Sequence, residues 1–139
     1  MNRRTLVRFA EVACPPQVRT EQRTERVLAE FALLSCALRP APRRALGFAF
    51  AALDQGARLY PAARGRRFAR LDDRVADAYL RALLARVGLV ERLKGLIVMC
   101  YYELPEVKAE IGYAPDPYIA AVARRRLESY GAEIRAAER

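Results

Sequence analysis

Apolar side chains recur three and four positions apart along much of the chain, a spacing typical of one face of an α-helix. Between residues 21 and 38 the repeating positions are Val27, Leu28, Phe31, Leu34 and Leu38. A second series, Leu46, Phe50 and Leu53, continues to about residue 59. Pro40 and Pro61 follow the two series and indicate their ends, because the residue before a proline avoids the helical conformation. The pattern therefore predicts helices over residues 21–38 and 42–59.

Three more helical segments follow in the second half. Asp72 and Asp73 favour the first turn of a helix whose apolar stripe is Val75, Tyr79, Leu80, Leu83, Leu84 and Val87. A short turn of helix over residues 106–111 is predicted after Pro105. A last helix opens at Asp116-Pro117 and runs to about residue 138, with a looser apolar stripe of Ile119, Val122, Leu127, Tyr130 and Ile134. No stretch alternates as a strand would. We expect an all-α fold, a single small bundle of five or six helices over residues 21–139. An extended N-terminal arm over residues 1–20 precedes it; Pro15-Pro16 interrupts this arm, and a helix in its middle stays open.

The segment from residue 89 to 104 is a helix with an unusual composition, because residues 95–102 carry no charge. Leu89, Leu93, Leu96, Ile97 and Cys100 share one face, which should meet the core. Val90, Val98, Tyr101 and Tyr102 lie on other faces. Two interpretations stay open: the helix is wrapped by its own neighbours, or its second face inserts into a larger protein. A domain of this size buries only about two thirds of its surface, which makes complete wrapping difficult.

The composition excludes several kinds of chemistry. The 139 residues suit one domain and include no histidine, so triads based on imidazole and zinc sites with a His ligand are excluded. The glycines form no phosphate-binding loop, so we expect no cofactor on this chain. The acidic cluster Asp72, Asp73 and Asp77 is typical of a solvated helix start, and we assign no metal ligand and no catalytic residue. An enzyme acting alone is not expected.

A net charge of +9 requires an explanation, and the whole excess lies in residues 1–70. The run from Arg64 to Arg70 suits a docking loop for a protein, a nucleic-acid contact, an anionic-lipid contact or a merely solubilising loop. Arg124, Arg125 and Arg126 point about 100° apart on a helix, which favours a solvated face.

The three cysteines are far apart and lie in apolar sequence, so we expect buried, reduced thiols in a reducing compartment. The N-terminus contains a double arginine without the apolar stretch of an export signal, and no apolar run is long enough for a membrane span. We expect a cytoplasmic protein, and contact with the inner membrane surface stays open.

Several short motifs resemble a known family. They are an Arg-Phe-x-x-Leu-Asp helix entry, a Tyr-Tyr pair that ends an apolar helix, a Pro-Glu-Val and an Ile-Gly-Tyr turn. Here these motifs are Arg67, Phe68, Leu71 and Asp72; Tyr101-Tyr102; Pro105-Glu106-Val107; and Ile111-Gly112-Tyr113. Over residues 64–119 the chain resembles the small helical subunit of FAD-dependent glucose-methanol-choline (GMC) oxidoreductases. That family includes gluconate 2-dehydrogenase subunit 3-like proteins, and the helical N-terminal region of long-chain alcohol oxidases is also similar.

This resemblance implies a noncatalytic accessory subunit that binds and stabilises a large GMC-type catalytic subunit. The partner would hold the FAD and act on an alcohol or hydroxyl-bearing apolar substrate. The residues expected to meet the partner are Arg66, Arg67, Phe68, Val98, Tyr101, Tyr102, Pro105 and Tyr113. The alternatives are a small basic helical module that binds nucleic acid and a membrane-surface adaptor; in the leading interpretation no nucleic acid is expected.

Overall fold

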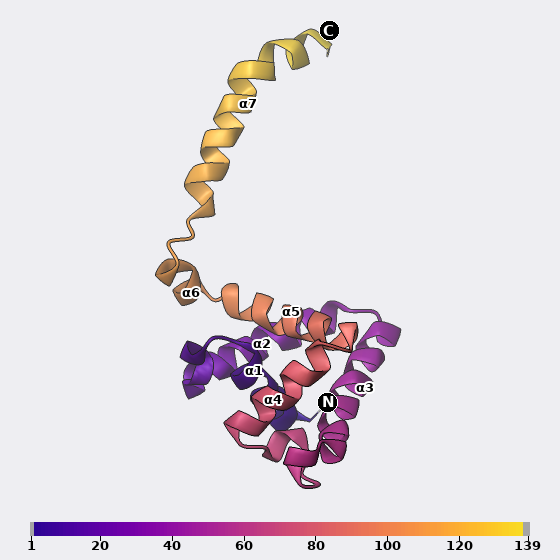
Figure 1. Cartoon of the computed structure of the whole chain (residues 1–139). Helices are drawn as coiled ribbons and strands as arrows, with labels where there is room; N and C mark the ends of the chain where they lie inside the picture. Colours follow the sequence, from indigo (N-terminus) through magenta and orange to yellow (C-terminus); the bar gives the residue numbers. More distant parts are fainter. Residues whose placement is uncertain (1, 138–139) are drawn as a thin grey trace. The chain divides into compact units, whose positions relative to one another are not determined.

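The computed structural model describes residues 2–137, together with the side chains of residues 2–20 and 22–131. The described part is all-α and contains no strand (Figure 1). Its seven α-helices are α1 (Arg3–Ala13), α2 (Glu21–Ala37), α3 (Pro40–Gly56), α4 (Asp73–Leu84), α5 (Gly88–Tyr102), α6 (Pro105–Glu110) and α7 (Pro115–Ala137). The six that follow residue 20 agree with the five or six expected there. Short 3-10 turns connect several of them, including one at Phe68–Arg70.

Helices α1 to α4 each begin at a capping side chain or at a proline. The side-chain oxygens of Asn2, Thr20 and Asp72 accept hydrogen bonds from backbone N–H groups in the first turns of α1, α2 and α4. Helix α3 begins at Pro40, whose missing N–H would be unsatisfied at a helix start in any case. The boundaries of the predicted helices are therefore close to those observed.

The chain forms two compact units, one ending at Leu104 and the other beginning at Pro105. The first unit contains α1 to α5 and the core described below. The second unit contains α6 and the 23-residue helix α7.

The core of the first unit is built around a row of aromatic rings. The Phe9 ring lies 5.3 Å from that of Phe50 in an edge-to-face arrangement and 6.3 Å from that of Phe68, measured between ring centroids. Phe50 in turn meets Phe31 at 5.8 Å, and Phe68 meets Tyr79 at 5.9 Å. Such pairs add stability beyond the area that they bury. The row joins α1, α2, α3, α4 and the 3-10 turn at Phe68–Arg70.

The position of α1 corrects the expectation of an extended arm over residues 1–20. Leu6, Phe9, Ala10 and Ala13 are buried, and the helix packs against α2, α4 and α5. The spacing of these residues places them on one helical face. Pro15 and Pro16 end α1 without separating it from the core, because the following 3-10 turn buries Val18. The helical bundle therefore begins at α1.

An ion-pair network holds the start of α4 against α1. The carboxylate of Asp73 meets Arg8 Nη1 at 2.7 Å and Arg19 Nη1 at 2.6 Å, and Arg8 also meets Glu11 at 3.0 Å. The hydrogen bond and charge of Arg8, followed by the charge of Arg19, lower the pKa of Asp73 below its ordinary value of 3.8. The network thus stabilises the ionised form of this carboxylate.

The end of α3 approaches α4 closely. Tyr79 donates a hydrogen bond to the carbonyl oxygen of Leu53 at 3.0 Å, and a Cβ at Gly56 would lie 2.9 Å from the Tyr79 hydroxyl oxygen. The buried carboxylate of Asp54 accepts the backbone N–H of Ala69 at 3.0 Å. Burial and the charge of Asp54 raise the pKa of Tyr79. These contacts fix the turn between α3 and α4.

Truncation of the central ring should be far more damaging than truncation of an exposed one. Phe9 is 0% exposed, so we expect Phe9→Ala to lower the free energy of unfolding by about 3–5 kcal/mol. Leu59 is 89% exposed, and the control Leu59→Ala should change it by less than about 0.5 kcal/mol. Urea unfolding followed by circular dichroism measures both. Equal effects would show that α1 does not belong to the core.

The Asp73 network should give a stability term that depends on pH. A lowered pKa in the folded state means that this term is complete above the ordinary carboxyl value of 3.8 and disappears as the pH falls through the lower folded value. Asp73→Asn should therefore lower the melting temperature at pH 7, with the difference from the wild type shrinking as the protein is acidified. Asp77→Asn, which removes one exposed pair with Arg81, should have a smaller effect. A difference between Asp73→Asn and the wild type that is independent of pH would contradict this assignment.

Candidate partner-binding surfaces

The residues expected to meet a partner divide into exposed and buried groups. Arg66, Arg67, Tyr102, Pro105 and Tyr113 are exposed, and Val98 is half-buried. Phe68 and Tyr101 are buried, which corrects their assignment to a contact surface.

Phe68 belongs to the core because its ring lies between those of Phe9 and Tyr79. The rest of its motif builds the entry to α4: Leu71 is buried, and Asp72 Oδ1 accepts the backbone N–H of Val75 at 2.9 Å. Arg66 Nη2 lies 3.9 Å from Asp72. The Arg-Phe-x-x-Leu-Asp motif thus forms a folded turn, and its arginines remain on the surface.

The face that α5 turns to the core is rotated from the predicted one. Leu93, Ile97 and Cys100 are buried as expected, whereas Leu89 is exposed and Leu96 is only half-buried. Val90 and Tyr101 are buried instead. The helix buries a different combination because it packs against α1, α2 and α4. A uniformly apolar sequence does not specify which side that will be.

The opposite side of α5 carries exposed apolar residues. Met99 and Tyr102 lie on it beside the half-buried Val98. Leu33 and Leu34 of α2 adjoin Met99 around a small hollow of about 160 Å³, which Glu30 and Glu103 also line. We call Leu33, Leu34, Val98, Met99 and Tyr102 the α5 surface. Leu33 was not predicted to belong to a contact surface, although it is an apolar residue that lies off the buried face of its helix.

Helix α7 is a second place where apolar side chains are exposed. Its exposed large apolar residues are Tyr118, Ile119, Leu127 and Tyr130. Three of them, Ile119, Leu127 and Tyr130, belong to the stripe predicted from the spacing, as does the half-buried Val122. Ile134, the last member of that stripe, lies outside the residues whose side chains are described. A helix with an exposed apolar stripe is typical of segments that bind in a groove of another protein.

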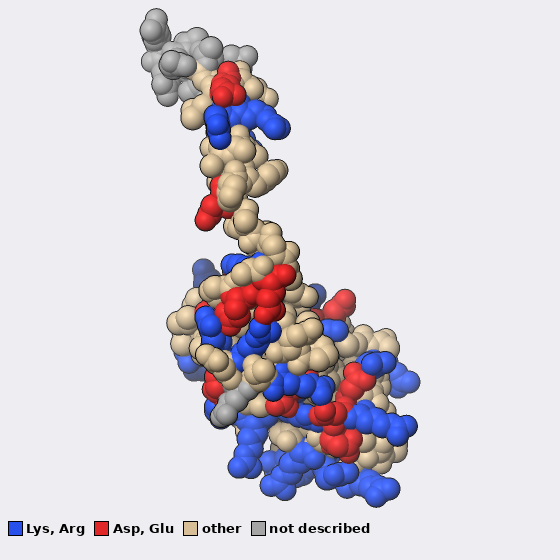
Figure 2. Space-filling model, turned by 90° about the vertical axis from the view of Figure 1, so that its left-hand side faces the viewer, with Lys and Arg blue, Asp and Glu red and all other residues tan. Residues whose placement is uncertain are grey.

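Basic side chains gather on the surface of the first unit. Figure 2 shows many Lys and Arg side chains on one face of the first unit, with acidic side chains among them. Arg64 and Gly65 adopt left-handed backbone conformations in the loop before α4, with φ of 50° and 74°. This sharp turn carries a run of exposed arginines at the surface of the first unit.

The thiols differ in exposure. Cys14 and Cys100 are buried, and burial raises the pKa of Cys14 to about 12 and also raises that of Cys100. Both thiols are therefore protonated and unreactive at neutral pH. Cys36 is exposed, contrary to the expectation that all three are buried.

Among the described residues, no group of three or more acidic or cysteine side chains is arranged to hold a metal ion. None of the helices in this part of the chain combines the length and the hydropathy that crossing a membrane requires. The chain was compared with protein-family models, curated proteins and solved structures, and no match was found in any of the three.

The adjacent tyrosines of α5 should respond differently to truncation. Tyr101 is 3% exposed and Tyr102 is 43% exposed. We expect Tyr101→Ala to lower the free energy of unfolding by about 3–5 kcal/mol and Tyr102→Ala to lower it by no more than about 1 kcal/mol. Denaturant unfolding of the isolated chain measures the two values. A larger loss for Tyr102→Ala would mean that the α5 surface is part of the fold.

Proposed function

We propose that this chain is a noncatalytic accessory subunit that binds and stabilises a larger protein, a GMC-type FAD-dependent oxidoreductase. The observation that carries the proposal is the exposed apolar α5 surface. Leu33, Met99 and Tyr102 are 67%, 45% and 43% exposed, so much of their apolar area is left uncovered by the first unit. Apolar side chains that gather on one surface are typical of protein-binding sites.

The α5 surface has the composition of an interface centre. Tyr and Met are enriched in such centres, where a large side chain is buried with little loss of conformational freedom. The Tyr102 ring already rests against Tyr101 at 5.2 Å, so it is partly held in place before binding. Covering these side chains would bury apolar area on both proteins at about 25 cal/mol per Å².

Helix α7 extends the available contact area. Its 23 residues correspond to a length of about 34 Å, which is comparable to the diameter of a small domain. Its described apolar stripe, from Ile119 to Tyr130, occupies about half of that length and suits a groove on a much larger protein. Specific complexes bury about 1,200–2,000 Å² in total, and the α5 surface and α7 offer two separate contributions to such an area.

The nature of the partner rests on the motif resemblance. In a GMC-type complex the large subunit supplies the FAD and the catalytic histidine, and this chain has no histidine. The substrate would be an alcohol or a hydroxyl-bearing apolar molecule bound by the large subunit. Binding of the accessory chain to the folded flavoprotein alone would raise the folded fraction of the flavoprotein by mass action.

Coexpression tests this function. A GMC-type flavoprotein from the same genome is expressed with and without this chain, and its soluble yield, FAD content and dehydrogenase activity are measured. We expect all three to rise several-fold when the chain is present, and the two proteins to copurify. Equal values with and without the chain would reject the stabilising role.

Matched variants locate the contact. Introducing a charge where apolar area is buried is costly, so Met99→Glu and Tyr102→Glu should each weaken copurification at least tenfold. Leu59→Glu places the same charge on another exposed apolar residue and should leave copurification unchanged. A duplex DNA titrated at several salt concentrations provides the competing test. Tight binding that weakens steeply with salt would favour the nucleic-acid alternative.

A further inference from the structure

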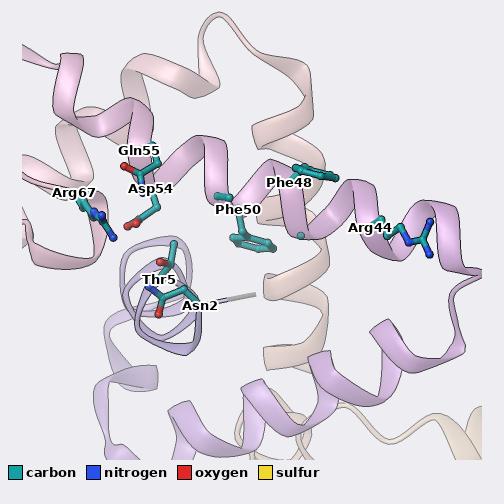
Figure 3. Close-up of a pocket in the computed structure, with 10 residues that line it drawn as sticks. Asn2, Thr5, Arg44, Phe48, Phe50, Asp54, Gln55 and Arg67 are labelled. Atoms are coloured by element: carbon teal, nitrogen blue, oxygen red, sulfur yellow. The ribbon is translucent and has the colours of Figure 1, made fainter.

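A pocket of about 410 Å³ lies between the N-terminus of α1 and one side of α3. Asn2 and Thr5 supply the α1 wall, and α3 contributes Arg44, Phe48 and Asp54 among others. Arg67 closes the pocket from the loop before α4. Figure 3 shows Thr5 and Asn2 on α1 near Asp54 and Arg67, with Arg44 farther along α3. The volume falls within the range of small-molecule sites, about 300–1,000 Å³.

Thr5 is the residue that indicates a ligand. It is 1% exposed, and its hydroxyl has no hydrogen-bond partner. Buried hydroxyl groups in folded proteins are normally bonded, so one left without a partner in the wall of a pocket requires an explanation. A neighbouring hollow provides a contrast: its buried Ser35 donates a hydrogen bond to the carbonyl oxygen of Phe31 at 2.7 Å. Of these two buried hydroxyl groups, that of Thr5 is the one without a hydrogen-bond partner.

The charges around the pocket favour an anion. Neither Arg44 nor Arg67 has an ion-pair partner among the described residues, and both residues line the pocket, Arg67 beside Thr5 and Asn2 and Arg44 farther along α3 (Figure 3). The N-terminus of α1 adds the positive end of a helix dipole. Asp54 is the acidic residue of the lining, and its Oδ1 is already used by the backbone N–H of Ala69. Hydrogen-bond donors therefore outnumber acceptors.

The pocket also has an apolar side. Phe48 is 76% exposed, and the Phe50 ring and the small residues Gly47 and Ala51 line the same stretch of α3. A Cβ at Gly47 would have no atom within 4 Å, so the groove along α3 is open there. An inorganic anion would leave this apolar stretch uncovered.

We propose that this pocket binds a small amphipathic organic anion, with a carboxylate or a similar head group on Arg67 and Thr5 and an alkyl or aryl body against α3. The head group accepts from Arg67, from the Thr5 hydroxyl and from the Asn2 amide. The body covers Phe48 and runs toward Arg44. This binding property belongs to the first unit and is independent of the accessory-subunit function.

Binding to the isolated full-length chain tests the proposal with decanoate as the probe. Calorimetry should give an affinity for decanoate at least tenfold higher than for decanol, which lacks the charge, and than for inorganic phosphate, which lacks the body. The NMR amide signals of Thr5 and Gly47 should shift with decanoate. Equal affinity for decanoate and decanol, or no binding of decanoate, would overturn the proposal.

Two substitutions identify the residues that bind the head group. Arg67→Gln should weaken decanoate binding at least fivefold, whereas the control Arg92→Gln on α5 should leave it unchanged. Thr5→Val removes a hydroxyl that has no partner in the free protein, so it should raise the melting temperature of the free chain and still weaken decanoate binding. Decanoate affinity that is the same in all of these variants would place the bound decanoate elsewhere and refute the site.

Discussion

The packing of the Phe9 ring is the constraint on which the rest of the first unit depends. This ring contacts Phe50 of α3 and Phe68 of the turn before α4. Phe50 in turn contacts Phe31, and Phe68 contacts Tyr79. The elements that carry them are far apart in the sequence, so each ring is buried only when the others are in place. The row therefore positions the surfaces as well as the core. Arg67 directly precedes the buried Phe68, and α1 forms a wall of the pocket because the Phe9 ring holds this helix in the core.

The spacing of apolar residues predicted most of the helices but not how far the bundle extends. Helices α2, α3, α4 and α7 lie close to their predicted ranges because each has a periodic apolar face and a capping residue or proline at its start. Helix α5 also lies close to its predicted range, although it begins without a side-chain cap. Helix α1 was expected to be an arm because Pro15 and Pro16 follow it closely. Its own face, with Leu6, Phe9, Ala10 and Ala13, contained the necessary signal. A proline pair ends a helix without deciding whether that helix packs on the core.

The candidate surfaces were harder to predict from the sequence because they depend on which helices become neighbours. In an apolar helix such as α5, periodicity cannot decide between Tyr101 and Tyr102, and the packing against α1, α2 and α4 decides it. The α5 surface includes Leu33 because α2 packs beside α5. The pocket combines α1, α3 and a loop, so no spacing in the sequence would have shown it. Phe68 of the Arg-Phe-x-x-Leu-Asp motif likewise packs in the core, because the fold brings Phe9 and Tyr79 against it.

The distribution of charge bears on what the apolar surfaces can bind. Two copies of a chain with a net charge of +9 repel each other, so self-association through the α5 surface or α7 is opposed at low ionic strength. A partner with an acidic surface experiences attraction instead, and its approach is accelerated by the same charge. The excess of arginine therefore has two effects: it keeps a chain with exposed apolar residues dispersed, and it favours a different protein over a second copy. This selectivity agrees with the proposed role in a complex of unlike subunits.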